Sequence, residues 1–301
     1  MSAATASPSF TTREIEVAAA GQLACLLEAR APKPGNVTPV AAFRDATYED
    51  FLASAVAIGP ALAAAGDRPL GVTIRAAVEA TASWAPSNTN LGLVLLLAPL
   101  ARAALRPGDG PLRARLHATL AETTVADARE TYLAIERAAP GGLSRSPEQD
   151  VADEPTVTLR DAMALAAERD AIAREYVTDF RITFETGAPA LRQALAARLS
   201  WSDAVVESYL TLLAAWPDTL IARKLGQVLG VYVQRRARAV LEAGGVRTGA
   251  GRQAIAALDR ELRDEGNTKN PGTTADLTGA AIYVVLLEGG WRREEWSDGR
   301  A

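Results

Sequence analysis

The segment LGLVLLLAPL, residues 91–100, is the most apolar run in this chain of 301 residues. A helix that spans a bilayer needs about 20 mainly apolar residues, and this run is far shorter. Its length and composition instead match a helix that is buried on all sides in a protein core. We therefore predict a core helix at residues 91–100 and no association with a membrane.

The sequence on either side of this run also has the spacing of helices. Apolar residues recur every three or four positions, which places them on one helix face. Two sets follow this spacing: Ile15, Ala19, Leu23 and Leu26, and further along the chain Ile221, Leu225, Val228 and Tyr232. Alanine and leucine dominate the composition, and both lose little conformational freedom in a helix. The sequence predicts an all-α fold.

Helix starts are marked by a threonine followed three positions later by an acid. In such a capping box the two side chains satisfy amides that the first helical turn leaves free. The pattern occurs at the pairs Thr11 and Glu14, Thr47 and Asp50, Thr158 and Asp161, and Thr273 and Asp276. The segment YVTDFRITFE, residues 176–185, has some strand character, but no nearby segment alternates well enough to pair with it. We therefore include it in the helical fold.

The segment RAAPGGLSRSPEQDVADEPTVT, residues 137–158, is rich in Gly, Pro, Ser and acids. We interpret it as a functional loop within one domain, because neither half of the chain ends in an obvious flexible linker. The predicted organisation is a single large multi-helix bundle over residues 13–290, between a flexible segment 1–12 and a tail 291–301. The first residues lack the basic start and apolar stretch of a signal peptide, so we expect a cytoplasmic protein.

The charge and the scarcity of two residue types limit the possible functions. A formal net charge of -4 at pH 7 disfavours nucleic-acid binding, which needs a basic surface. One cysteine, Cys25, and one histidine, His117, exclude a disulfide framework and a metal site built from several thiolates or imidazoles. We expect Cys25 to be buried and His117 to lie on a solvated helix face. Catalysis would then use carboxylates, amides, hydroxyls, lysine or arginine.

Four polar stretches interrupt the helical pattern, each next to a predicted helix end. They are residues 28–45 with Glu28, Lys33, Gly35, Asn36 and Asp45; residues 87–92 with Asn88, Asn90 and Gly92; residues 217–226 with Asp218, Arg223 and Lys224; and residues 266–279 with Asn270, Gly272, Thr273, Thr274 and Asp276. The amides and partial positive charge of a helix N-terminus attract anions, and lysine and arginine add full charges for phosphates. The combination predicts a polyphosphate site where helix ends converge, although the chain has neither a P-loop nor a dinucleotide-binding glycine motif.

The same residues also have structural interpretations. Asn88 and Asn90 could cap the helix that follows them. Asp218 could cap its own helix, and Asp276 could complete a capping box. Taken singly, none of these residues decides the function.

Two further charged sets are interpreted as solvent-exposed. Asp170 and Arg174 have the spacing of an ion pair along a helix surface. Arg235, Arg236 and Arg238 fit a solvated helix face. We assign a function to neither set.

Six motifs in a fixed order give a more specific result. They are KPGNV, RDATYEDFLASA, SNTNLG, DEPTVTLRDAMALAAERDAIAREY, DTLIARKLG and NPGTTADLTGA. In this order they resemble the triphosphoribosyl-dephospho-CoA synthase family, the ATP:dephospho-CoA triphosphoribosyl transferases. The resemblance implies an all-helical enzyme that transfers the triphosphoribosyl group of ATP to 3'-dephospho-CoA and releases adenine. The product is the precursor of the prosthetic group of citrate lyase and malonate decarboxylase acyl carrier proteins.

The resemblance also implies ligand-site residues, and the chain departs from the family pattern at some of them. The family's polar motifs fall on Lys33, Gly35, Asn36, Asp45, Asn88, Asn90, Gly92, Asp218, Arg223, Lys224, Asn270, Gly272, Thr273 and Asp276. A family motif Asn-Thr-His-Lys-Gly here reads Asn-Thr-Asn-Leu-Gly at residues 88–92, and Phe43 replaces a histidine. Two alternatives therefore stay open: a paralogue that acts on another acceptor, for example in methanopterin-type one-carbon carrier biosynthesis, and a non-catalytic nucleotide-binding protein.

In the implied reaction the ribose C1' gains positive charge as its bond to adenine breaks, and the acceptor hydroxyl needs a general base. Carboxylates suit both roles. Asp45 and Glu28 are the first candidates, and Asp276 is the competitor.

The remaining residues are expected to bind ATP, its metal ion or a second subunit. Lys33, Arg223 and Lys224 would hold the triphosphate, and Asp218 or Asp276 would bind Mg²⁺, which favours a few carboxylates plus phosphate oxygens. Further nucleotide contacts are expected from Gly35, Asn36, Asn88, Asn90, Gly92, Asn270, Gly272, Thr273 and Thr274. The apolar helix faces would serve the contact of a homodimer as well as a core.

Overall fold

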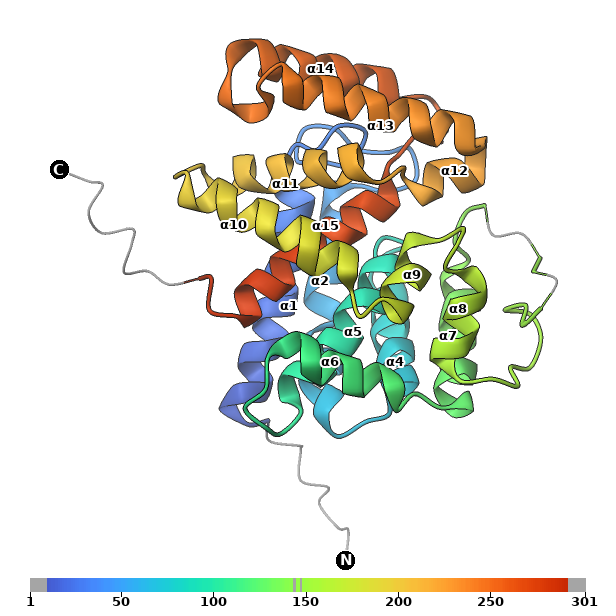
Figure 1. The fold of residues 1–301 in the computed structure, drawn as a ribbon. Helices are drawn as coiled ribbons and strands as arrows, with labels where there is room; N and C mark the ends of the chain where they lie inside the picture. Colours follow the sequence, from blue (N-terminus) through green and yellow to red (C-terminus); the bar gives the residue numbers. More distant parts are fainter. Residues whose placement is uncertain (1–9, 143–144, 147, 292–301) are drawn as a thin grey trace, which may run out of the picture.

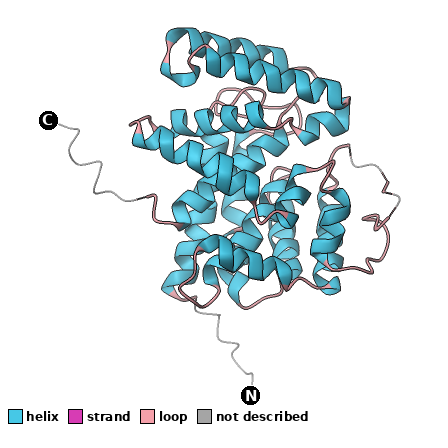
Figure 2. Cartoon of the chain, viewed as in Figure 1, coloured by secondary structure: helices cyan, strands magenta, loops and turns pink. Residues whose placement is uncertain are grey.

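The computed structural model describes residues 10–142, 145–146 and 148–291. Within these ranges the fold is all-α, as predicted, and the ribbon contains helices and loops without a strand (Figure 2). Most of the predicted flexible segment 1–12 and of the predicted tail 291–301 lies outside the described residues, so these two assignments stay predictions.

The helices follow one another with short connections, apart from the long segment between α7 and α8 (Figure 1). The first part of the chain forms α1 (Thr12–Arg30), α2 (Tyr48–Ala57), α3 (Gly59–Ala63), a 3-10 turn (Ala64–Gly66), α4 (Leu70–Ala82), α5 (Leu91–Leu105), α6 (Leu112–Ala121) and α7 (Val125–Ala138). The second part forms α8 (Leu159–Ala166), α9 (Ala171–Val177), a π-helical turn (Thr183–Gly187), α10 (Ala188–Ala196), α11 (Trp201–Ala215), α12 (Thr219–Leu225), α13 (Gln227–Glu242), a 3-10 turn (Gly245–Arg247), α14 (Gly249–Leu262) and α15 (Gly272–Leu287).

Helices α5 and α15 form the centre of the core. Helix α5 contains the apolar run 91–100 and is buried over most of its length, which confirms the predicted core helix. Helix α15 is buried almost throughout and packs against α1, α5 and α11. The backbones of α5 and α15 approach closely, because a Cβ on Gly279 would lie only 2.5 Å from Cδ1 of Leu93. Cys25 is buried, as expected.

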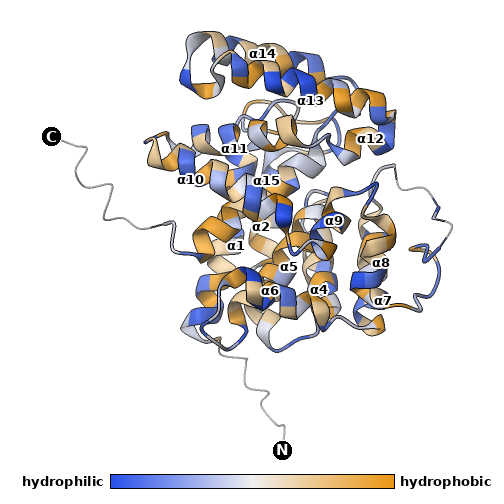
Figure 3. Ribbon diagram, in the orientation of Figure 1, coloured by the Kyte–Doolittle hydropathy of each residue, from blue (hydrophilic) through white to orange (hydrophobic). Residues whose placement is uncertain are grey.

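The remaining helices cover this centre on opposite sides. Helices α13 and α14 lie side by side above α11, and α4, α6 and α7 lie at the opposite end (Figure 1). Along α13 and α14 the ribbon alternates between hydrophobic and hydrophilic residues, as expected for helices with one face in solvent (Figure 3). Among the described residues, no helix combines the length and the apolar character needed to cross a bilayer.

The predicted capping boxes meet different outcomes. Those of Thr11 with Glu14 and Thr47 with Asp50 are complete. Thr158 caps α8 and accepts a hydrogen bond from the amide of Asp161. The box predicted for Thr273 and Asp276 is wrong, because α15 already begins at Gly272 and the Thr273 hydroxyl contacts Thr219 instead. Asp276 is thus free of a capping role.

Two predicted helix faces are also wrong in register. Helix α1 buries the face of Val17, Gly21 and Ala24 instead, and Ile15 is largely exposed. The second predicted face, from Ile221 to Tyr232, was expected to lie on one helix. Instead Gly226, at φ 92°, ends α12, and α13 starts in a new direction.

The break at Gly226 determines which side chains of the second set reach the core. Ile221 on α12 is buried, whereas Val228 on α13 is 86% exposed. Leu225 and Tyr232 are partly exposed as well. The 3.6-residue period could not reveal this change in axis, because a glycine at a helix end leaves the spacing of apolar residues unchanged.

The strand-like segment 176–185 is a distorted helical turn. Asp179 and Phe180 have positive φ angles, and a π-helical turn follows at Thr183–Gly187. Glu175 holds this turn, since its two carboxylate oxygens accept hydrogen bonds from the amides of Ile182 and Thr183, each at 2.8 Å. Burial raises the pKa of Glu175 to about 7.

Candidate functional site

A large pocket lies where several helix ends meet, as the sequence predicted. Its volume is about 1380 Å³, larger than the roughly 300–1,000 Å³ usual for one small ligand. It is lined by the first turns of α5, α9 and α15, by α12, by the last turns of α4 and α7, and by parts of α1, α2 and α8. The volume is sufficient for two ligands at once.

The segment that contains Lys33 packs on α11 and α14 beside this pocket. Gly35 adopts φ 76° and donates its amide to Oδ1 of Asp259 on α14 at 2.8 Å. The Asn36 side chain donates to the hydroxyl of Tyr209 at 3.0 Å, and this hydroxyl donates to the carbonyl of Pro34 at 2.8 Å. Prolines and glycine therefore fix a loop that packs on α11 and α14, and Asn36 also reaches the pocket lining.

Lys33 points into the protein, contrary to its predicted role as an accessible phosphate ligand. Its side chain is buried, and its ammonium lies 2.9 Å from Oε1 of Glu28. The ammonium also donates to the main-chain carbonyls of Glu28 and Ala31. Buried ammonium groups require such partners, since an unpaired charge is costly in a low dielectric. Lys33 does not line the pocket, but its partner Glu28 does.

Helix N-termini converge on the pocket, but carboxylates already occupy several of them. Asp170 caps α9 with Oδ1, which accepts from the amides of Ile172 and Ala173. Asp218 caps α12 and also accepts from the amide and hydroxyl of Thr274 at the start of α15, each at 2.8 Å. A carboxylate at a helix N-terminus neutralises the partial positive charge that would attract a phosphate. These helix ends are therefore poorer anion sites than the sequence suggested.

Asp218 is the buried connector of α12 and α15 and does not line the pocket. Burial raises its pKa, although its hydrogen bonds oppose this shift. Both of its oxygens accept protein donors, so the predicted metal role does not fit this carboxylate. The hydroxyl of Thr274 is likewise used within the protein. Asn88, in contrast, does bond to the start of α5, because its Oδ1 accepts from the amide of Leu91 at 3.0 Å. Asn90 occupies the N-cap position, but its side chain makes no capping bond.

Asp276 has the most unusual environment of the acidic residues in the pocket. Its side chain is half-buried, lines the pocket and makes no hydrogen bond within the described residues. Burial raises the pKa of Asp276 well above its ordinary value, and the nearby charges of Glu28, Asp218 and Asp170 raise it further. The carboxylate lies against Gly92 at the start of α5: a Cβ on Gly92 would be 2.1 Å from Asp276 Oδ2. Only glycine leaves room for it there.

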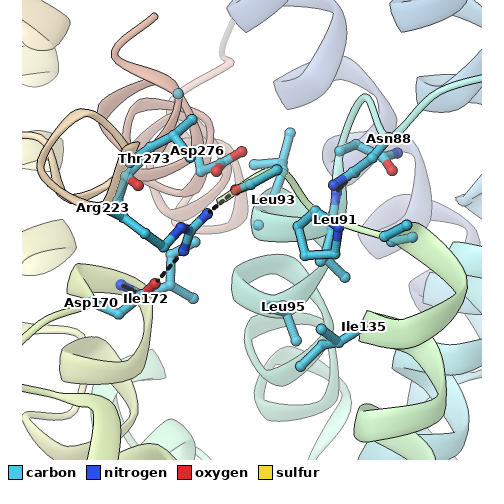
Figure 4. Close-up of a pocket in the computed structure, with 18 of the residues that line it drawn as sticks. Asn88, Leu91, Leu93, Leu95, Ile135, Asp170, Ile172, Arg223, Thr273 and Asp276 are labelled. Carbon is cyan, nitrogen blue, oxygen red and sulfur yellow. Dashed lines mark hydrogen bonds and ion pairs between the residues drawn. The ribbon is translucent and has the colours of Figure 1, made fainter. Parts of the chain in front are cut away.

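The cationic side of the pocket is centred on Arg223 of α12. Its guanidinium donates to Oδ2 of Asp170 at 3.2 Å and to the carbonyl of Gly141 at 3.3 Å (Figure 4). Lys224 lies beside Gly141 as well, since a Cβ there would be 3.4 Å from its Cε. Asp170 is thus no partner of Arg174 in a surface pair. It fixes Arg223 at the pocket.

Most predicted site residues lie together at the pocket. Those that line it are Glu28, Asn36, Asp45, Asn88, Asn90, Gly92, Arg223, Lys224, Asn270, Gly272, Thr273 and Asp276. Those that do not line it are Lys33, Gly35, Asp218 and Thr274. Asp45 is exposed. The functional role of each residue stays a prediction.

Sequence reasoning missed several pocket residues. Asp170 was hidden by its spacing to Arg174. Arg137, Arg145 and Arg169 also line the pocket, and the density of arginines around the acidic segment 137–158 was the available signal. Thr81, at the end of an ordinary amphipathic helix, gave no signal in the sequence.

The pocket offers no protein cage for a metal ion. No group of three or more potential ligands among Asp, Glu, His and Cys is close enough to hold a metal in the described parts of the chain. Of the two predicted Mg²⁺ ligands, Asp218 does not fit, because both of its oxygens accept protein donors and it lies outside the pocket. Asp276 lines the pocket, and its metal role stays a prediction.

Comparisons with known proteins agree with the motif resemblance. The family model of ATP:dephospho-CoA triphosphoribosyl transferases matches residues 14–295. A protein of Pseudomonas fluorescens named "Probable 2-(5''-triphosphoribosyl)-3'-dephosphocoenzyme-A synthase" is 29% identical over 204 residues, which cover 67% of this chain and 62% of that protein. A protein of the same name from Pseudomonas paraeruginosa is 32% identical over 108 residues, 35% of this chain and 36% of its own. The matched part therefore spans less than two thirds of these relatives.

A solved structure is similar over most of the fold. It is described as "Crystal structure of putative triphosphoribosyl-dephospho-coA synthase from Archaeoglobus fulgidus", and it matches with a TM-score of 0.63 and 30% sequence identity. The match covers 80% of this chain and 100% of that chain.

Proposed function

Because the chain belongs to the ATP:dephospho-CoA triphosphoribosyl transferase family, we propose that it transfers the 5'-triphosphoribosyl group of ATP to a hydroxyl of 3'-dephospho-CoA and releases adenine. The observation that carries this proposal is the position of Asp276. Its unpartnered carboxylate lies between the cationic side of the pocket at Arg223 and the uncharged first turn of α5 (Figure 4).

The reaction exchanges one bond at the ribose C1'. The C1'–N9 bond breaks with its electron pair going to adenine, and the acceptor oxygen forms a bond to C1'. The proton lost by the acceptor hydroxyl balances the proton gained by adenine. A carboxylate near C1' stabilises the positive charge that develops there, and it also accepts the hydroxyl proton.

Asp276 suits this role better than the other candidates. A carboxyl with a raised pKa is a stronger base than an ordinary one, and general bases work best when their pKa approaches the working pH. Glu28 lies near Asp276, since its Cγ is 3.5 Å from a Cβ placed on Gly279, about one helical turn further along α15. Glu28 is held by Lys33, which compensates its charge. Asp45 lies at the exposed edge and would contact the acceptor.

The triphosphate is assigned to the cationic side of the pocket. Arg223 is oriented by Asp170 and Gly141, so little conformational freedom is lost when it binds a phosphate. Lys224 and the missed residues Arg145 and Arg169 supply further positive charge. Mg²⁺ is expected to accompany the triphosphate and to be bound mainly by phosphate oxygens, and no step above depends on it.

The decisive experiment is chromatography of the products formed from ATP, Mg²⁺ and dephospho-CoA. Free adenine that appears only when dephospho-CoA is present supports the proposal. Adenine formed only with a different hydroxyl acceptor would identify a paralogue. Nucleotide binding without any product would indicate a non-catalytic protein. The control is Arg252→Ala. Arg252 lies on α14, forms an exposed ion pair with Asp203 and does not line the pocket.

A further inference from the structure

One wall of the pocket carries no charge. All pocket-lining residues between positions 78 and 95 are apolar, small or uncharged polar residues, from the end of α4 through the loop to the start of α5. We call this surface the uncharged wall. It includes Val78, Leu91 and Leu95, and Figure 4 shows Leu91 and Leu95 across the pocket from Asp170 and Arg223.

The uncharged wall contains buried polar atoms without hydrogen-bond partners. Thr81 is 5% exposed and Asn90 is 7% exposed, yet Oγ1 of Thr81 and Nδ2 of Asn90 bond to nothing in the described ranges. The hydroxyl of Ser87 in the same wall is also unpartnered. An unsatisfied buried polar group costs about 1–3 kcal/mol, so folded proteins normally pair such groups. Several of them on one wall of a pocket indicate that a ligand supplies the partners.

Two other side chains of the wall are held by hydrogen bonds. The Ser54 hydroxyl is 2.5 Å from the hydroxyl of Thr89, and Asn88 bonds to the start of α5. The unpartnered atoms of Thr81 and Asn90 therefore lie on a wall in which Asn88 and Thr89 already have partners. Preorganised polar groups of this kind determine which ligand group is accepted.

The chemistry of the uncharged wall suits a heteroaromatic base better than a phosphate. A phosphate is bound most strongly by cations, and this wall supplies no lysine or arginine. Flat apolar contacts from Val78, Leu91 and Leu95 suit a ring, an amide donor suits a ring nitrogen, and a hydroxyl can donate or accept. Gly92, two residues after Asn90, contacts Asp276, so a base on this wall lies on the opposite side of Asp276 from Arg223.

We propose that the uncharged wall binds the adenine of ATP and that Thr81 and Asn90 select this base. This inference rests on the proposed function. With the triphosphate at Arg223 and the base on the uncharged wall, C1' lies between them near Asp276. Neither residue supplies a charge to the reaction; each positions the leaving group and distinguishes adenine from guanine.

The test measures binding of three probes by calorimetry: ATP, GTP and inorganic tripolyphosphate. Thr81→Val and Asn90→Leu keep the side-chain size and remove the polar atom. Each is expected to weaken ATP binding about fivefold to tenfold, as for one lost hydrogen bond, to reduce the preference for ATP over GTP, and to leave tripolyphosphate binding unchanged. The matched control is Thr131→Val, because the Thr131 hydroxyl is also buried and unpartnered but does not line the pocket.

Three results would overturn the assignment. They are unchanged ATP affinity in both variants, an equal loss of tripolyphosphate affinity, and a loss confined to dephospho-CoA, which would assign the wall to the acceptor. If ATP binding changes as expected but no adenine is ever released, the base site stands and the proposed transfer reaction fails.

Discussion

The ammonium of Lys33 lies 2.9 Å from the carboxylate of Glu28, and both side chains are buried. This pair changes the interpretation of the segment around Lys33. The sequence suggested a polar stretch in which Lys33 holds the triphosphate, whereas the structure shows a loop that buries Lys33. Glu28 reaches the pocket with its charge compensated and its position fixed.

Lys33→Met is expected to destabilise the whole protein and not to act selectively on ATP binding. Removing one partner of a buried ion pair leaves the other uncompensated, at a cost of about 3–5 kcal/mol. Urea unfolding measures this loss. The double variant Lys33→Met, Glu28→Gln should recover much of it. A single variant with wild-type stability and weakened ATP affinity would show that the ammonium binds phosphate after all.

Asp276→Asn is expected to stabilise the protein at pH 8 while abolishing adenine release. The pKa of Asp276 is raised in the folded state, so the folded protein holds this proton more tightly than the unfolded chain does. The free energy of unfolding therefore falls as the pH rises from about 4 through that raised pKa. Asparagine stays neutral and gives up no hydrogen bond. Thermal unfolding should therefore show a melting temperature higher by on the order of a few degrees. Asp45→Asn, at the exposed edge, serves as the comparison and should not raise the melting temperature.

Arg223→Ala is expected to weaken tripolyphosphate binding between about tenfold and hundredfold, the range for a lost charge-assisted hydrogen bond. The effect should diminish at high salt, because the interaction is electrostatic. Calorimetry at two salt concentrations measures both quantities. The control Arg252→Ala removes an arginine from an exposed ion pair with Asp203 and should change neither. Equal losses in both variants would indicate a general charge effect.

Gly92→Ala is expected to abolish turnover in a folded protein. The added Cβ would lie 2.1 Å from Oδ2 of Asp276 and 2.7 Å from Cδ1 of Ile172, so the carboxylate must move. Circular dichroism tests the fold, and adenine release tests activity. Gly110→Ala is the matched control, since a Cβ there meets nothing within 4 Å. Normal turnover in Gly92→Ala would argue against Asp276 as the base.

The buried Glu175 should make stability depend on pH. Its pKa is about 7 in the folded protein but roughly 4.3 in an unfolded chain. The folded state holds the proton of Glu175 more tightly. The stability that Glu175 contributes is therefore fully present below about pH 4.3 and is lost as the pH rises through 7. The unfolding free energy of wild type minus that of Glu175→Gln should therefore fall by up to about 3–4 kcal/mol between pH 4 and 8. A difference independent of pH would contradict the raised pKa.

The sequence predicted the helical class and the core helix at 91–100, because these depend on local patterns, and most of the predicted site residues line the pocket. Capping residues such as Thr11 and Thr47 are recognised within four positions. The buried face of α1 and the break at Gly226 depend on how helices pack, so local spacing placed them wrongly.

Contacts between residues far apart in the sequence could not be predicted either. Asp170 bonds Arg223, 53 positions away, although Arg174 is nearer in sequence. Lys33 was expected to bind phosphate because it is a cation in a loop rich in proline and glycine, but Tyr209 and Asp259 from distant helices bond to this loop. Thr81 could not be recognised, since an unsatisfied hydroxyl becomes evident only when its surroundings are known.

The bonds of Asp218 and Thr219 have a consequence for biosynthesis. Asp218 joins the start of α12 to Thr274 on α15, and the Thr219 hydroxyl contacts both the amide of Ala171 and the hydroxyl of Thr273. The segment after residue 271 thus completes the hydrophobic centre and the charged side of the pocket in one step. While that segment is still in the ribosomal exit tunnel, the emerged helices lack one of their two central partners. Their uncovered apolar surfaces are the kind of surface that chaperones protect during translation.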